Sequence, residues 1–199
     1  MRTVILFAAT FNADARTLNA APLRDPRDPA RPKRLERMQV EHERFMAAAL
    51  KEAERAKNLG NAAVGAVIVC NGEFLSRGCN EVSSTFDPTA HAEAAAIRKL
   101  TTARRQLNSN SQADSGPFAG AIIYSTLEPC PMCCWLSCIT GFSTIVIGAR
   151  HADLGISFGG YTVEKLIDIS ERRIRVISGI LADECMAIYR SGPFKPGPR

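Results

Sequence analysis

Hydrophobic residues recur with two different periods along the chain, one typical of helices and one typical of strands. In residues 40–58 the apolar positions Met46, Ala49, Leu50 and Ala53 follow offsets of 0, 3, 4 and 7, which predicts a helix. Two short apolar runs, residues 64–69 and 73–77, then flank the pair Asn71-Gly72. Because Asn-Gly is a strong two-residue turn signal, these runs predict a β-hairpin.

The rest of the pattern predicts a mixed α/β protein. A polar loop over 80–89 leads into a helix that begins near His91, and a second polar stretch, 108–117, predicts a surface insertion. The further expected elements are a strand at 121–126, a helix from Pro131, strands at 143–147 and 173–177, and a final helix carrying Ala182, Cys185, Met186 and Tyr189 on one face. This order, α-β-β-α-β-α-β-β-α, predicts a sheet between two layers of helices.

Chain length and composition predict one folded domain with an extension. The 199 residues suffice for a single well-cored domain. Residues 1–37 hold four prolines among scattered arginines and show no sustained period, so we expect a flexible N-terminal extension. Met38 is a candidate native start, and residues 38–199 would form the folded domain.

The positive charge of the chain lies mainly in this extension. Of the formal +5, residues 1–37 contribute eight Lys/Arg against four Asp/Glu, which leaves 17 against 16 for residues 38–199. A body so close to neutral lacks the electrostatic footprint of a protein that grips a phosphate backbone. We therefore expect no nucleic-acid partner.

Cysteine usage and the short apolar runs indicate a reduced, soluble environment. Four of the seven cysteines fall within nine positions, from Cys130 to Cys138, a crowding that favours thiols and a metal over a disulfide framework. Apolar runs are too short to cross a bilayer, and residues 4–9 are at the short limit for a signal peptide. We expect a cytoplasmic protein without a membrane partner.

Two motifs provide candidate metal ligands and a candidate acid. Zinc prefers nitrogen and sulfur donors, and a catalytic zinc site has three protein ligands and one open position. His91 supplies the nitrogen, and Cys130 and Cys133 would project from one face of the first turn of a helix, whose N-terminus favours thiolates. Glu93 would lie beside the metal without binding it. The combination of H-x-E with P-C-x-x-C is typical of zinc deaminases, in which the acid moves protons.

A structural zinc module without catalysis is the alternative from another class. It would need a fourth cysteine ligand, either Cys134 or Cys138. Cys134 is adjacent to a ligand and should point elsewhere, and Cys138 lies about one helical turn further along, where a free cysteine commonly packs in the core. A closed site would also leave Glu93 without a role.

Over residues 40–190 the chain resembles the cytidine deaminase-like superfamily, in the branch that contains cytosine deaminases, small guanine deaminases and tRNA adenosine deaminases. The similarity is carried by Asn80 and by the segments DPTAHAE at 87–93 and TLEPCPMC at 126–133. The resemblance implies a three-layer α/β/α sandwich around a mixed five-stranded sheet, bound Zn²⁺ and a homodimer. It also implies that Asn80 contacts the base and that Val64 lines the pocket.

The members of this branch act on different substrates, and segments of this sequence resemble more than one of them. DPTAHAE and the region of Asp153 resemble guanine deaminases, whereas residues 173–189 resemble cytosine deaminases. Asp153 would bind substrate or cap a helix, and Phe158 and Tyr161 would cover the ring or serve as packing. We expect hydrolytic deamination of a small nucleobase or nucleoside. The alternative is a tRNA adenosine deaminase, whose basic, aromatic C-terminal tail is not found here.

Overall fold

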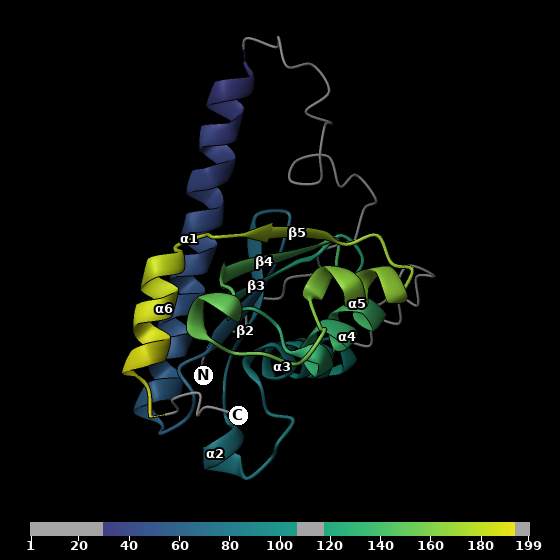
Figure 1. The fold of residues 1–199 in the computed structure, drawn as a ribbon. Coiled ribbons are helices and arrows are strands. Elements are labelled where there is room, and N and C mark those ends of the chain that lie inside the picture. Colours follow the sequence, from purple (N-terminus) through teal and green to yellow (C-terminus); the bar gives the residue numbers. More distant parts are fainter. Residues whose placement is uncertain (1–29, 107–117, 194–199) are drawn as a thin grey trace, which may run out of the picture.

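The strands form one mixed sheet in the order β2-β1-β3-β4-β5, as seen in a computed structural model that describes residues 30–106 and 118–193 (Figure 1). The expected insertion at 108–117 and most of the expected extension lie outside the described residues. In chain order the elements are α1 (Arg31–Asn58), β1 (Gly65–Cys70), β2 (Glu73–Cys79), α2 (Val82–Thr85), α3 (Ala92–Gln106), β3 (Ile122–Leu127), α4 (Pro131–Thr140), β4 (Thr144–Ala149), the 3-10 helix η1 (Ala152–Leu154), α5 (Val163–Ile169), β5 (Arg175–Ser178) and α6 (Ala182–Ser191).

Strand pairing is antiparallel on one side of the sheet and parallel on the other. The predicted hairpin is confirmed: β1 pairs antiparallel with β2, and both turn residues, Asn71 and Gly72, have positive φ (52° and 78°). Such angles define the turn whose twist matches that of the strands it joins. β1 also pairs antiparallel with β3, whereas β3, β4 and β5 run parallel.

Helices cover both faces of the sheet, α1 and α6 on one and α3, α4 and α5 on the other (Figure 1). The alternation of side chains along β1 separates two hydrophobic cores. Val67 and Val69 pack with Phe45 of α1, whereas Ile68 packs with Ala96 of α3. The three-layer sandwich that the sequence predicts is confirmed.

Two strand glycines allow helices to approach the sheet closely. A Cβ on Gly65 would lie 2.1 Å from the carbonyl oxygen of Ala49 in α1, and a Cβ on Gly78 would lie 2.3 Å from that of Ala92 in α3. No side chain fits at either position. Gly78 therefore sets the distance between the sheet and α3, the helix that follows His91.

Several elements differ from the sequence prediction, among them the short helix α2, which lies within the expected polar loop 80–89. α1 begins at Arg31, within the expected extension 1–37, because Pro32 is compatible with the first turn of a helix, where its missing N–H costs nothing. β4 and β5 are not consecutive, since η1 and α5 lie between them. Parallel neighbours need a crossover, which a direct connection cannot provide. Within the described ranges, no helix is both long and apolar enough to cross a membrane.

Candidate metal and catalytic site

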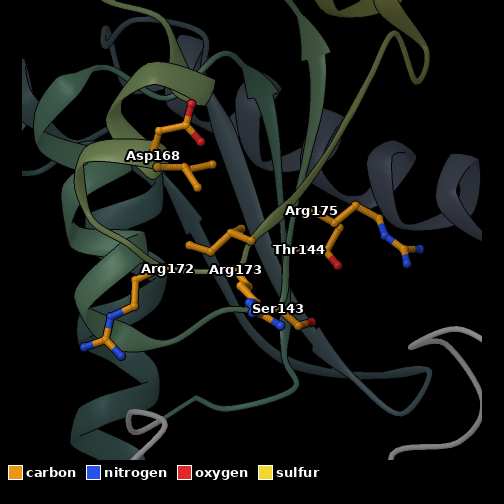
Figure 2. Close-up of a pocket in the computed structure, with 8 residues that line it drawn as sticks. Ser143, Thr144, Asp168, Arg172, Arg173 and Arg175 are labelled. Atoms are coloured by element: carbon orange, nitrogen blue, oxygen red, sulfur yellow. The ribbon is translucent and has the colours of Figure 1, made fainter.

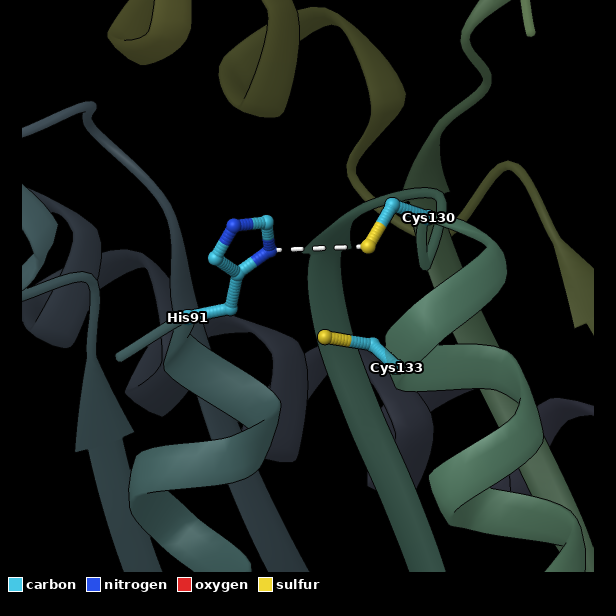
Figure 3. Close-up of side chains that lie close together, drawn as sticks. All are labelled: His91, Cys130 and Cys133. Carbon is cyan, nitrogen blue, oxygen red and sulfur yellow. Dashed lines mark hydrogen bonds between the residues drawn. The ribbon is translucent and has the colours of Figure 1, made fainter. Parts of the chain in front are cut away.

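Two helices that begin at the same end of the sheet bring together one imidazole and two thiols (Figure 3). His91 directly precedes α3, Cys130 is the N-cap of α4, and Cys133 lies in the first turn of α4. Their ligand atoms all lie within 4.8 Å of one another, and His91 Nδ1 is 3.5 Å from Cys130 Sγ. In a tetrahedron, zinc bonds of about 2.0–2.3 Å separate donor atoms by roughly 3.5–3.8 Å. The donor set therefore fits a zinc ion.

The backbone around Cys130 prepares its sulfur to bind a cation. Cys130 is extended (φ −67°, ψ 169°), and Pro131 opens the helix at a position where proline is favoured. Hydrogen bonding from the Cys133 thiol, and then from His91, holds the pKa of Cys130 well below that of an ordinary thiol. Because only deprotonated cysteine binds zinc, this sulfur is a prepared ligand at neutral pH.

Glu93 lies buried beside the ligands without joining their cluster. Its side chain accepts a hydrogen bond from Ser125 Oγ at 3.2 Å. Burial, and then the nearby Cys130 sulfur, raises the pKa of the Glu93 carboxyl above its ordinary range. A carboxyl with a raised pKa can both accept and return a proton near neutral pH. Ser125 was missed in the sequence because it is an inward-facing strand residue without a spacing signal.

The two extra cysteines of α4 belong to the hydrophobic core. Cys134 and Cys138 are 0% and 1% exposed and pack with Phe142 and Val163 on the α3–α5 side of the sheet. Among the residues described, the only metal-ligand cluster is His91, Cys130 and Cys133. With these three ligands a bound zinc would keep a fourth position for water, so the donor set gives no support to a closed structural zinc site.

Val64 and Asn80 lie beside the segment that carries His91. The Asn80 N–H donates to the Val64 carbonyl at 2.9 Å, and the next residue, Glu81, donates its N–H to Ala90 at 2.8 Å. Val64 packs in a small cluster with Ala92, the residue after His91. The structure thus brings both residues to the edge of the metal site, and their contact with a base stays a prediction.

The second set of expected substrate residues makes contacts within the protein. Asp153 Oδ2 accepts a hydrogen bond from the Arg150 N–H at 3.0 Å, which is a turn-capping contact. Tyr161 donates its hydroxyl to the Pro129 carbonyl at 2.6 Å and so supports the turn that carries Cys130. Phe158 packs edge-on against His151, with ring centroids 5.1 Å apart. Their roles in substrate binding stay predictions.

A charge network centred on the buried Glu128 connects the ends of β3 and β4. Glu128 accepts hydrogen bonds from the His151 N–H at 2.9 Å and from Arg150 at 3.2 Å, and Arg150 also pairs with Glu164 at 2.7 Å. The network fixes the Glu128-Pro129 turn directly ahead of Cys130. Sequence reasoning missed it because the partners are far apart in the chain.

A separate pocket lies at the opposite end of the strands (Figure 2). It has a volume of ≈ 480 Å³ and is lined at the start of β4 and β5 by Ser143 and Thr144 together with Arg172, Arg173 and Arg175. The side chains of Arg172 and Arg175 point away from each other. This pocket therefore lacks the convergent donors of the metal site.

The fold and the donor set together define a zinc-dependent deaminase. Residues 39–149 match the family described as the cytidine and deoxycytidylate deaminase zinc-binding region. The chain belongs to this family, and its homologues in the family are hydrolytic deaminases.

Several individual proteins are similar to this chain in sequence or in structure. A tRNA-specific adenosine deaminase of Bacillus subtilis (strain 168) is 33% identical over 73% of this chain and 84% of its own length. One of Aquifex aeolicus (strain VF5) is 39% identical over 54% of this chain, and the match spans 65% of the Aquifex protein. A solved structure from work on A-to-I editing by tRNA:A34 deaminases is 30% identical, with a TM-score of 0.60 over 73% of this chain and 98% of that one.

These relatives contradict the expectation that nucleic acid is not a partner. They are named as deaminases specific for tRNA. The expectation was wrong because the net charge of a domain is a sum, which does not report where individual charges lie or which side chains contact a partner. RNA loops are also read by stacking and by base edges, which need little net charge.

Proposed function

We propose that this chain is a tRNA adenosine deaminase, which replaces the exocyclic amine of an adenosine by oxygen and so forms inosine. The observation that carries the proposal is the similarity to the Bacillus tRNA-specific adenosine deaminase across most of both chains, joined to a complete His-Cys-Cys donor set. Deamination of a free base, the main expectation from the sequence, has less support. The support for a free base comes from similarity of fold: a structure of NE0047 in complex with 2,6-diaminopurine is 25% identical to this chain, with a TM-score of 0.61.

Each step of the reaction has a candidate residue in this chain. His91, Cys130 and Cys133 would hold the zinc. When bound, zinc lowers the pKa of a water ligand to about 7 and so supplies a nucleophile at neutral pH. Water attacks C6 of adenine, the C6–N6 bond breaks, and ammonia leaves. Glu93 would accept the proton of the water and return protons first to N1 of the ring and then to the departing amine.

Four further residues would position these groups. Ser125 donates to Oε1 of Glu93 and so orients the carboxyl. Asn80 and Val64 flank the segment of His91, where they would contact the edge and the face of the adenine. Tyr161 holds the Pro129 carbonyl and through it the turn before Cys130.

Inosine formation in tRNA tests the proposal. Zinc-loaded protein should convert the adenosine at the first anticodon position of a tRNA to inosine, and free guanine, cytosine and adenosine should release no ammonia. Glu93→Gln should lose about 10²–10⁴-fold in kcat while retaining zinc and fold, because general acid–base catalysis is removed. Glu54→Gln, an exposed acid on α1, is the matched control and should retain full activity. Ammonia released from a free base, without inosine in tRNA, would overturn the assignment.

A further inference from the structure

Phe86 is exposed to a degree that is unusual for a phenylalanine. Its side chain is 93% exposed, the highest value among the large hydrophobic residues that the structure describes as exposed. It ends the short helix α2 with φ 56° and ψ 23°, in the left-handed region. Glycine and asparagine occupy this region readily, whereas a bulky aromatic residue does so at a cost. Packing does not explain a phenylalanine here.

The segment around Phe86 is firmly held, so its exposure does not come from a loose loop. The side chain of the buried Asn61 accepts from the Ser84 N–H and donates to Ser84 Oγ, both at 3.0 Å. Thr85 Oγ1 donates to the Glu81 carbonyl at 2.6 Å. α2 is thereby fixed to the connection between α1 and β1, and the ring is presented at a defined position.

Phe86 lies in the loop that leads directly into the candidate metal ligand His91. Phe86 lies between Asn80 and His91 in a loop that the hydrogen bond from Glu81 N–H to the Ala90 carbonyl closes at 2.8 Å. α2 extends beyond the end of the sheet at which β2 ends (Figure 1). A positively charged side chain lies beside this loop: the guanidinium of Arg98 is 3.6 Å from the carboxylate of Asp87.

We infer that the Phe86 ring stacks on an unpaired nucleobase that neighbours the target adenosine in the RNA loop, with Arg98 near the phosphate of that nucleotide. The inference rests on the proposed function, since it requires an RNA substrate. Single-stranded RNA is commonly held by bases stacked on aromatic side chains. A ring fixed in advance in the loop before His91 loses little conformational freedom when the base arrives.

Binding to an RNA hairpin tests this inference separately from catalysis. We would measure the Kd of zinc-loaded, full-length protein for an anticodon stem-loop with 2-aminopurine next to the target adenosine. All variants carry Glu93→Gln, so that no turnover occurs. Phe86→Ala should weaken binding about 5- to 150-fold, the range of one base–aromatic stack, and should reduce the quenching of 2-aminopurine fluorescence. Phe86→Tyr should restore both.

Stability provides the internal control. Phe86→Gly removes the ring and relieves the left-handed backbone, so its Tm should equal or exceed that of the parent protein while its RNA affinity falls. Ile169→Ala, which shortens another exposed hydrophobic side chain, should leave RNA binding unchanged. A reduced Tm in Phe86→Gly would indicate a packing role and overturn the inference.

The remaining outcomes separate the two proposals. If the hairpin binds equally well to the parent and to Phe86→Ala, the inference is wrong and the proposed function stands. If binding depends on Phe86 but the enzyme with Glu93 forms no inosine, the stacking contact between Phe86 and RNA stands and the proposed function fails. If the parent protein does not bind the hairpin at all, both are wrong.

Discussion

Replacing Gly78 by alanine should displace α3 from the sheet and so distort the metal site. The added Cβ would lie 2.3 Å from Ala92 O and 2.4 Å from Ala96 N, about 1 Å closer than the shortest ordinary van der Waals contact of 3.4 Å. Both opposing atoms belong to the backbone of α3, so no side chain can rotate away and the helix itself must lift. Overpacking of this kind costs about 1–3 kcal/mol.

The lift would also move the residues at the start of α3. His91 precedes the displaced Ala92, and Glu93 follows it, so a candidate ligand and the proposed proton carrier shift relative to Cys130 and Cys133. A misplacement of about 1 Å can reduce turnover about 10²-fold. We therefore expect kcat on tRNA to fall by about that factor and the zinc content to decrease.

Three measurements check this reasoning. Thermal unfolding should show Tm lower by ~2–12 °C, which corresponds to the expected loss of stability in a chain of this size. Metal analysis and inosine formation then report the displacement of the ligands and of Glu93. Gly160→Ala is the control, because a Cβ there meets no atom within 4 Å, and it should behave as the parent protein. If Gly78→Ala matches the parent in Tm, zinc content and turnover, α3 does not rest on this glycine as described.

Two further substitutions address the metal site. Cys133→Ala should lose most of the zinc from a protein that otherwise carries one ion per chain, whereas Cys138→Ala, a core cysteine five residues away, should retain it; equal zinc in both variants would refute the ligand assignment. Tyr161→Phe removes the hydroxyl that donates to the Pro129 carbonyl and should cost about 1–3 kcal/mol, measured by denaturant unfolding, with a reduced kcat. An unchanged kcat would mean that the turn ahead of Cys130 needs no support from Tyr161.

The sequence predicted those features that depend on short-range patterns. The hairpin at Asn71-Gly72 and the helix from Pro131 follow from local turn and helix-start signals, and the structure has both. α5 was missed because its seven residues, Val163–Ile169, are too few to establish a period. Its necessity becomes clear only when β4 and β5 are seen to pair in parallel.

The candidate site divides in the same way. His91, Cys130 and Cys133 could be found because zinc chemistry imposes a residue type and a spacing. Ser125 and Glu128 could not, since each acts through a partner that is distant in the chain. Phe86 gives no signal in the sequence, because its exposure and its left-handed backbone exist only in three dimensions.

The length of α1 has a consequence for the local unfolding of the protein. At 1.5 Å per residue its 28 residues extend about 42 Å, roughly twice the length of a six-residue strand. No side chain of α1 ahead of His42 is buried. Amide hydrogens of residues 31–41 should therefore exchange by fraying, with low protection, whereas those from Phe45 to Ala56 should exchange only when the sheet itself unfolds. In energetic terms, α1 is one helix divided between two cooperative units.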